Sequence, residues 1–466
     1  MGALSDKQIA ELRALVGQSY VRTGDAVLEL DPGWSSHNLD AGVVVSPATL
    51  AEVASVVQWC HSHHVALVPQ GGRTGLVGGG YSHPGEIVLS LLRLDTIDPI
   101  IADDRVAVVG AGCTLEKLQT VAAQCGLEPG IDLAARGSAT IGGMISTNAG
   151  GVMAFRNGVM RHRVLGLEAV LADGSIYSDL TRVVKNSAGY DLKHLLIGGE
   201  GTLGVVTKAV IKLDPLPAAT ATAMIALPSV EAALATIRRA LSTEAGHLRA
   251  AEAMWSNYIK LAASSHGWSS PEVDLEQPIF LLLLVGGPNE DALHTALGNI
   301  FLDIADQFEN VNGIVAGSAR QAAELWSLRD DTEVIYRLHP DAPSYDVSVP
   351  QSEIAQYVAE VQAGLSAIDP TIQPYIFGHL ADGNLHIEIN RAGPLPSDLA
   401  RRVDNVLYAN LRGFGGSFSA EHGVGSKRIG PMFDTTDAGK LSAMRLIKAT
   451  LDPSNLMNPG KVLPIS

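Results

Sequence analysis

The chain has 466 residues, 46% of them hydrophobic, and a formal net charge of −16 at pH 7. This length exceeds what one hydrophobic core usually holds, so we expect two or three domains. The acidic balance argues against nucleic acid and anionic membrane surfaces as partners. No apolar run reaches the ~18 residues that a membrane span needs, so none is expected.

Residues 1–39 are expected to form a short N-terminal helical segment. The first residues lack the basic, apolar pattern of a signal peptide and the Arg-rich pattern of a transit peptide. Cys60, Cys113 and Cys125 lack the spacing of a metal site and are interpreted as buried thiols in a reducing compartment. These features favour a cytoplasmic protein.

Residues 40–95 are predicted to form a first α+β lobe that contains a glycine-rich loop. Thr49 and Glu52 form a capping box that opens its helix. Six of the ten residues from Gly71 to Gly80 are glycine, and strand-like segments flank the loop. We interpret it as a cradle for an anion rather than a flexible linker, because its bare N–H groups can turn toward a ligand.

Residues 96–215 are predicted to form a second lobe. Within it, residues 137–151 are almost entirely small or hydroxylated and carry no charge, which would let a large flat ligand approach the backbone. Residues 165–177 are predicted to form a hairpin. Residues 199–204 match the dinucleotide-binding fingerprint by spacing, but a strand follows where that fingerprint opens a helix, so we reject a Rossmann domain.

Residues 216–416 are predicted to form a second domain. Residues 221–316 read as strand, helix, strand, strand, helix, strand, which is the ferredoxin-like order. A helix, a strand at 344–350, a second helix and a hairpin at 375–388 follow. Residues 417–466 are too few for a domain and should pack back on the rest.

The hairpin carries two histidines. If Asp382-Gly383 is a two-residue turn, His379 lies directly opposite His386 with Cβ atoms ~5 Å apart. Two such imidazoles can converge on one divalent ion, or they can form a stacked neutral pair; the pair alone leaves both interpretations open.

A second cluster of chemical groups follows at 419–425. Two glycines, Gly423 and Gly425, suggest a tight turn that fixes Glu421 and His422. Glu421 could complete a His/His/carboxylate site with an open position, and His422 beside it would act as a base.

Several motifs resemble one known superfamily. These are Pro-x-Gly-Gly-x-Thr-Gly from Pro69, Gly-Ser-x-x-Ile-Gly-Gly from Gly137, Thr-Asn-Ala-Gly-Gly from Thr147, Gly-Tyr-Asp-Leu at 189–192 and Gly-Glu-Gly-Thr-Leu-Gly at 199–204. They resemble the FAD-binding domain of the vanillyl-alcohol oxidase/p-cresol methylhydroxylase superfamily. From about residue 40 onward the chain most resembles its FAD-linked D-2-hydroxy acid dehydrogenase branch, the D-2-hydroxyglutarate and D-lactate dehydrogenases.

This resemblance implies an α+β fold with a two-lobed FAD-binding domain at 40–215, a ferredoxin-like substrate domain at 216–416 and a C-terminal segment that returns to the FAD domain. The residues it implies for FAD binding are Pro69, Gln70, Gly71, Gly72, Arg73, Thr74, Gly75, Gly78, Gly79, Gly137, Ser138, Ile141, Gly142, Gly143, Thr147, Asn148, Gly150, Glu200, Gly201, Gly204, Val205 and Asn458. Relatives with covalent FAD carry a histidine where Arg73 stands here, so FAD should be non-covalent.

The resemblance also implies a mechanism. His379, His386 and Glu421 would bind a divalent metal, for which zinc best matches the ligand set. His422 would take the hydroxyl proton of a small D-2-hydroxy acid while hydride leaves to flavin N5, giving the 2-oxo acid. Arg329 would hold the substrate carboxylate with its two-pronged guanidinium.

Two positions depart from the pattern of the hydroxyglutarate enzymes. Ser344 stands where they carry lysine, and Glu388 stands where they carry asparagine. We therefore expect both residues to contact a substrate whose distal end is apolar, hydroxylated or cationic rather than a second carboxylate. The alternative that Glu388 is a further metal ligand stays open.

Electrons would pass to an electron-transfer flavoprotein, a cytochrome or a quinone. Direct use of oxygen and a homodimer both stay open. The alternative is a glycolate-oxidase-type subunit that acts only inside a multi-subunit complex.

Overall fold

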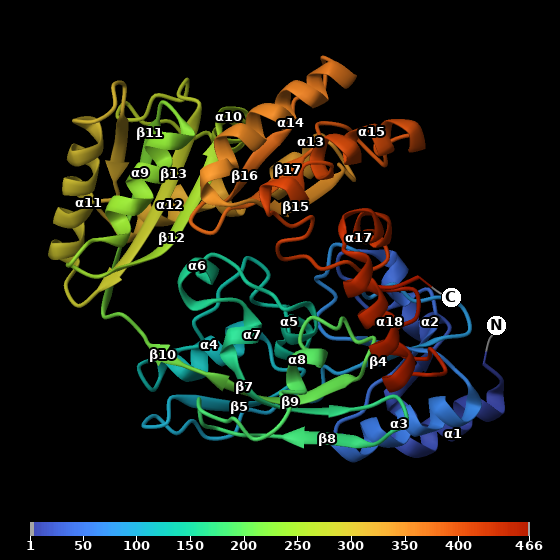
Figure 1. The fold of residues 1–466 in the computed structure, drawn as a ribbon. Helices are drawn as coiled ribbons and strands as arrows, with labels where there is room; N and C mark the ends of the chain where they lie inside the picture. The colour runs from blue at the N-terminus through green and yellow to red at the C-terminus, as the bar shows by residue number, and fades with distance from the viewer. Residues whose placement is uncertain (1–3, 465–466) are drawn as a thin grey trace. The chain divides into compact units, whose positions relative to one another are not determined.

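The computed structural model describes residues 4–464. Residues 1–3, at the start of the predicted N-terminal segment, and residues 465–466 lie outside this described part. The chain divides into two compact units (Figure 1). Unit 1 consists of Met1–Gly151, Asn157–Leu216 and Glu421–Ser466, and unit 2 consists of Val152–Arg156 and Pro217–Ala420.

Unit 1 mixes short helices with strands. Its helices are α1 (Asp6–Val16), α2 (Asp25–Leu28), α3 (Leu50–His63), α4 (Leu115–Ala123), α5 (Ile141–Thr147), α7 (Met160–Arg163), α8 (Lys193–Leu196), α17 (Ile429–Thr435) and α18 (Ala438–Leu451). Its strands are β1 (Val21–Thr23), β2 (Val43–Val45), β3 (Leu67–Gln70), β4 (Ile87–Ser90), β5 (Val106–Gly110), β6 (Leu127–Glu128), β7 (Val164–Val170), β8 (Ile176–Asp179), β9 (Val205–Lys212) and β10 (Asp214–Pro215). Short helix α6 (Ala154–Asn157) is divided by sequence: its first three residues belong to unit 2 and Asn157 belongs to unit 1.

Two four-stranded sheets form the lobes of unit 1. One has the order β1-β2-β4-β3, and the other has the antiparallel order β5-β9-β7-β8, so the predicted β7–β8 hairpin is confirmed. The Thr49 hydroxyl accepts the Glu52 N–H at 3.2 Å and caps α3 as predicted, while the Glu52 carboxylate accepts from Ala48. Strand β9 follows Gly204 directly, which confirms that the glycines at 199–204 open no Rossmann helix.

The C-terminal segment packs within unit 1. Met457 forms a parallel bridge with Leu67 at the start of β3, and Lys448 of α18 donates to the carbonyl of Thr202 at 2.9 Å. Figure 1 shows α17 and α18 in red among the blue and green elements of this unit. Segments from opposite ends of the sequence therefore meet beside the glycine-rich loops.

Unit 2 is built on one seven-stranded sheet. Its strands are β11 (Ala219–Leu227), β12 (His247–Trp255), β13 (Ile279–Gly287), β14 (Asn312–Val315), β15 (Ser344–Ser348), β16 (Tyr375–His379) and β17 (Asn384–Glu388). Its helices are α9 (Val230–Leu241), α10 (Ser256–His266), α11 (Glu290–Ala305), α12 (Ala319–Asp330), α13 (Glu333–Leu338), α14 (Ile354–Ile368), α15 (Ser397–Tyr408) and α16 (Leu411–Phe414).

The strand order is β14-β11-β13-β12-β16-β17-β15. Its first four strands have the ferredoxin-like order that the sequence predicts. The prediction missed α10, which lies between the second and third of these strands. Its apolar positions Tyr258, Ile259 and Ala262 pack onto the sheet, whereas its remaining polar residues hide the pattern in the sequence.

The predicted register of the histidine hairpin is wrong by two residues. His386 on β17 pairs with Phe377 rather than with His379, because the connection runs from Leu380 to Gly383 instead of being a two-residue turn. Gly383 has φ +79°, and a Cβ there would lie 1.9 Å from the Val349 carbonyl oxygen. Since the slip is an even number of residues, both histidines stay on the same face of the sheet.

The two faces of this sheet carry different layers. Helices α9, α11, α14 and α15 pack on one face, and α10, α12 and α13 pack on the other (Figure 1). Within residues 4–464, no helix has both the length and the apolar character that a bilayer crossing demands. Cys60 and Cys113 are buried as expected, whereas Cys125 is exposed because it lies in the turn after α4.

Candidate active site

The two glycine-rich stretches of unit 1 pack directly against each other. A Cβ on Gly71 would lie 2.0 Å from the Thr140 hydroxyl oxygen, and a Cβ on Gly72 would lie 1.8 Å from the Ser138 carbonyl oxygen. Glycine is therefore required at both positions by close backbone approach. Apart from its chain neighbours, no described residue has a heavy atom within 4 Å of the Cβ position of Gly75, so the loop opens away from this contact.

The second stretch contains the short helix α5. Thr140 caps its first turn by accepting from Gly143, and Asn148 ends it in the left-handed conformation at φ +56°. The hydroxyl of Thr147 donates to the Gly143 carbonyl at 3.1 Å. This hydroxyl therefore offers a bound molecule acceptor lone pairs rather than its proton.

Glu200 and Asn458 join the loops to the C-terminal segment. The Asn458 side chain donates to the carbonyls of Gly79 at 2.9 Å and Glu200 at 2.8 Å. The buried Glu200 carboxylate accepts the N–H groups of Val424 at 2.7 Å and Gly425 at 2.8 Å. Burial raises the pKa of Glu200, and these two hydrogen bonds oppose that rise. The carboxylate thus holds the turn that follows His422.

The residues predicted to bind FAD therefore come together in unit 1, from four separate stretches of sequence. They also offer what such a group needs. The Asn458 Oδ1 atom is buried and has no hydrogen-bond partner within residues 4–464, so an acceptor is left for an N–H of a bound molecule. Together with the open position at Gly75, this fits a cofactor that lies against the backbone.

In unit 2, one face of the sheet gathers charged side chains. Glu252 on β12 is fully buried and lies in register with His379 on β16. Its Oε1 is 2.7 Å from His379 Nδ1, and its Oε2 is 2.7 Å from Arg329 Nη2. Burial raises the pKa of Glu252, but the charges of His379 and Arg329 outweigh it, so the pKa is lowered overall.

Arg329 is held from several sides. It is 7% exposed, its guanidinium lies 4.9 Å from the centre of the Phe377 ring, and its backbone carbonyl accepts the Tyr258 hydroxyl at 3.0 Å. Its Nε atom is buried and has no hydrogen-bond partner in the described part of the chain. One N–H donor of the guanidinium is therefore left for a ligand.

His386 neighbours His379 and Asp346. The two imidazole centroids are 5.5 Å apart with the rings nearly perpendicular, so the histidines are not stacked face to face. His386 Nδ1 is 3.8 Å from Asp346 Oδ1, and Asp346 is fully buried. The Ala420 N–H donates to Asp346 Oδ2 at 3.1 Å, which holds the last residue before Glu421 against β15.

Glu421 and His422 belong to unit 1, where the tight turn predicted for their glycines is confirmed. Glu421 Oε1 accepts the Gly151 N–H at 2.5 Å. Gly423 has φ +83° and Gly425 has φ +52°, and a Cβ on Gly425 would lie 2.1 Å from the Val77 carbonyl oxygen. The four residues predicted for the metal and the base thus divide between the units, with His379 and His386 in unit 2.

The two departures from the family pattern contact each other. Ser344 on β15 pairs in register with Glu388 on β17, and its hydroxyl donates to Glu388 Oε1 at 2.8 Å. The Tyr336 hydroxyl of α13 donates to Glu388 Oε2 at 3.2 Å. Glu388 is 4% exposed and shares the sheet face of His386. Burial, followed by the nearby Glu388 charge, raises the pKa of Tyr336 far above its usual range.

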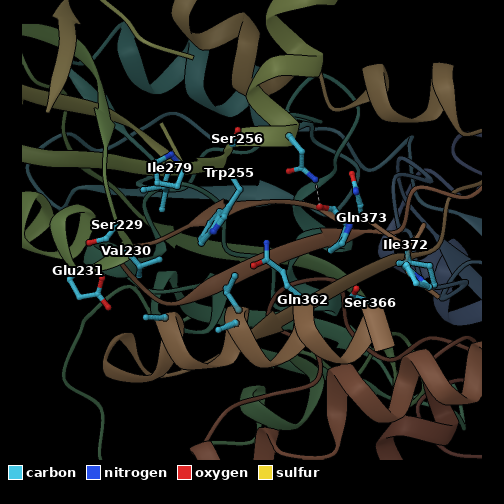
Figure 2. A pocket seen from close by; sticks show the side chains of 17 residues that line it. Ser229, Val230, Glu231, Trp255, Ser256, Ile279, Gln362, Ser366, Ile372 and Gln373 are labelled. Atoms are coloured by element: carbon cyan, nitrogen blue, oxygen red, sulfur yellow. Dashed lines mark hydrogen bonds between the residues drawn. The ribbon is translucent and has the colours of Figure 1, made fainter. Parts of the chain in front are cut away.

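The opposite face of the same sheet carries a cavity of about 560 Å³ (Figure 2). Trp255, Ser229 and Gln362 line it, between α9, α14 and the sheet. Side chains alternate along β12, so Trp255 faces away from Glu252. The residues that line this cavity include none of the predicted site residues.

Sequence reasoning missed Glu252 and Tyr336. Glu252 is the only acidic residue in the otherwise apolar stretch 250–255, and a carboxylate in a buried strand requires a charged partner. That signal could have identified it. Tyr336 lies in a short helix without a motif, and only the fold brings it to Glu388.

Two family descriptions match the chain: "FAD binding domain" over residues 41–179 and "FAD linked oxidases, C-terminal domain" over residues 216–462. A D-2-hydroxyglutarate dehydrogenase of Xanthomonas citri pv. viticola is 36% identical, covering 98% of this chain and 97% of that protein. A mitochondrial D-2-hydroxyglutarate dehydrogenase of Bos taurus is 36% identical over 91% of this chain and 77% of its own length.

Solved structures share the fold. An alkyldihydroxyacetonephosphate synthase has a TM-score of 0.74 at 16% identity, and the match covers 98% of this chain and 85% of the synthase chain. A p-cresol methylhydroxylase with substrate bound has a TM-score of 0.73 at 16% identity, covering 99% and 97%. These likenesses confirm the two-part α+β fold of the vanillyl-alcohol oxidase type that the motifs predict.

Proposed function

This chain belongs to the family of FAD-linked oxidases, and on that premise we propose that it oxidises a D-2-hydroxy acid to the 2-oxo acid with the help of a divalent metal. The observation that carries the proposal is the bridge made by Glu252. One buried carboxylate contacts both Arg329 and His379, on the sheet face that also presents His386. An anion-binding guanidinium and a metal-binding imidazole therefore belong to one connected group.

His379, His386 and Glu421 form the proposed metal site. An ionised carboxylate only accepts hydrogen bonds, so His379 Nδ1 carries a proton toward Glu252 and the ring lone pair lies on Nε2, the atom that would bind an ion. Ala420 is anchored to Asp346, beside His386, and the next residue is Glu421. This tether supports Glu421 as the third ligand. Two histidines and one carboxylate suit zinc with an open position for substrate.

The substrate roles follow from charge. Arg329 binds the carboxylate next to the reacting carbon, using the Nε donor that has no protein partner. His422 removes the hydroxyl proton, and the Glu200 carboxylate holds the turn that follows it. Bound FAD would supply the hydride acceptor for the α-hydrogen, and a metal ion held by His379, His386 and Glu421 would lower the pKa of the substrate hydroxyl.

The distal end of the substrate would lie at Ser344 and Glu388. A carboxylate there would face the buried Glu388 charge, so we propose a monocarboxylic substrate whose far end is apolar, hydroxylated or cationic. D-2-hydroxyglutarate, for which the relatives are named, would then not be the preferred substrate of this chain.

We further propose that FAD is non-covalent and that a separate protein or quinone accepts the electrons. Arg73 supports the first point, because it offers no nucleophile and its side chain contacts Gln70 at 2.7 Å and the Asp31 carbonyl at 2.9 Å. The second point is supported by the relatives, which are named dehydrogenases rather than oxidases.

The test is flavin reduction without oxygen in the purified single chain. D-2-hydroxy acids should bleach the bound flavin, and His422→Asn should slow this by about 10²- to 10⁴-fold while FAD stays bound, as expected for loss of a general base. His294→Asn is a matched control, since His294 lies on α11 near Glu290 at 3.8 Å. Bleaching by His422→Asn at the wild-type rate would contradict the assigned base.

A further inference from the structure

Glu252 is a charged group that contacts both halves of the proposed chemistry. Its two oxygens have different partners, His379 on β16 and Arg329 on α12, each at 2.7 Å. The carboxylate is fully buried beneath an apolar cluster that includes Met254, Tyr258 and Phe377. Because a buried carboxylate is strongly destabilised unless its charge is compensated, both contacts are needed to hold it there.

We infer that Glu252 is a positioning residue that fixes the metal-facing imidazole and the substrate-binding guanidinium together. This inference rests on the proposed function and deepens it. On the His379 side, the carboxylate can only accept, so it selects the tautomer that is protonated at Nδ1 and has its lone pair on Nε2.

On the Arg329 side, the same carboxylate contacts Nη2, and Nε has no hydrogen-bond partner among residues 4–464. The Phe377 ring beneath the guanidinium restricts its tilt, with the guanidinium carbon 4.9 Å from the ring centre. The remaining donor edge is thereby presented in a fixed direction. A substrate carboxylate and a metal ion would therefore each find a partner already oriented by Glu252.

The variant Glu252→Gln tests whether Glu252 orients His379 and Arg329 or only compensates charge. The amide has nearly the same shape, but it carries one oxygen and one NH₂ group. Whichever way the amide turns, its NH₂ faces one of two donors, His379 Nδ1–H or the Arg329 guanidinium. Either the imidazole must then move its proton to Nε2, which removes the lone pair for an ion, or the guanidinium must lose its contact.

The experiment uses the full chain loaded with FAD. The Zn²⁺ dissociation constant is measured by competition with a coloured chelator, and KM and kcat are measured with the best D-2-hydroxy acid. In Glu252→Gln, the Zn²⁺ constant should rise about 10- to 100-fold, or KM should rise about tenfold or more, with kcat changed less than KM. Glu276→Gln is the matched control, because Glu276 pairs with Lys260 on the surface of the same unit with 80% of its side chain exposed.

Both constants within twofold of the control would overturn the inference, even if the variant melts at a lower temperature, because a purely structural role would affect only stability. Wild-type protein that oxidises hydroxy acids but binds no Zn²⁺ would refute the metal centre and with it the role of Glu252 toward an ion.

A second measurement needs no variant of Glu252, in case Glu252→Gln does not fold. Histidine-selective ¹⁵N labelling of the wild-type protein reports the tautomer of each imidazole, and His379→Gln identifies the resonance of His379. The inference predicts the Nδ1-protonated tautomer with slow exchange of that proton. The Nε2-protonated tautomer would overturn it.

Discussion

Exchanging Ser344 and Glu388 for lysine and asparagine should convert the substrate preference of this enzyme. These are the residues that the D-2-hydroxyglutarate dehydrogenases resembled here carry at the two positions. In this chain the Ser344 hydroxyl donates to Glu388 Oε1 at 2.8 Å, and the Tyr336 hydroxyl donates to Oε2 at 3.2 Å. The variant Ser344→Lys/Glu388→Asn replaces a buried anion with an amide and adds a cation.

The magnitude follows from the distances. A substrate carboxylate that accepted a hydrogen bond at the Ser344 position would lie about 4 Å from the Glu388 carboxylate, where two like charges repel by about 4 kcal/mol at an effective dielectric of 20. At about 1.4 kcal/mol per factor of ten, removing that repulsion corresponds to roughly 10³-fold in kcat/KM for a dicarboxylate. D-lactate has no distal carboxylate, so its kcat/KM should change far less.

The assay is stopped-flow reduction of the bound flavin without oxygen, with D-2-hydroxyglutarate, D-lactate and longer monocarboxylic D-2-hydroxy acids. Ser352→Lys/Glu353→Asn is the matched control, because Ser352 and Glu353 form the same hydrogen-bonded pair, at 3.1 Å, on the exposed surface of unit 2. The reasoning is refuted if the wild-type chain already has its highest kcat/KM with D-2-hydroxyglutarate, or if the double variant leaves the ratio of substrates unchanged.

Two further predictions concern the FAD-binding loops. Acid precipitation should release all of the yellow colour into solution, since Arg73 occupies the position of the attaching histidine; colour that stays with the protein would contradict non-covalent binding. Gly72→Ala should give protein with little bound FAD, because the new Cβ would lie 1.8 Å from the Ser138 carbonyl oxygen and force the two loops apart. The flavin-to-protein absorbance ratio measures this, and Gly430→Ala, with nothing within 4 Å of its Cβ position, is the control. Equal FAD content in both variants would show that the loops do not need this contact.

The sheet of unit 2 shows what the sequence could predict. The order of strands and helices was sufficient for the ferredoxin-like half, since its topology follows from alternating elements. For the hairpin at 375–388, the sequence predicts the correct sheet face for the two histidines but the wrong pairing register of the two strands. Alternation along a strand determines the face, whereas register depends on the connection, and Val349 from another segment packs against Gly383.

Residues that act through tertiary contacts were harder to predict. The motifs identified His379, His386 and Arg329, but the carboxylate between them lies on β12, more than a hundred residues before His379. Nothing local links Glu252 to either partner. Tyr336 is similar: it reaches Glu388 only because α13 packs over the sheet, and its sequence carries no pattern that would mark it.

Metal-assisted oxidation of a D-2-hydroxy acid is tested by comparing the two enantiomers of one 2-hydroxy acid, without oxygen, in the purified chain before and after removal of metal by a chelator. The D enantiomer should bleach the flavin, the L enantiomer should not, and chelation should slow the bleaching until Zn²⁺ is returned. Equal reduction by both enantiomers, or reduction by the D enantiomer at an unchanged rate in metal-free protein, would contradict this proposal.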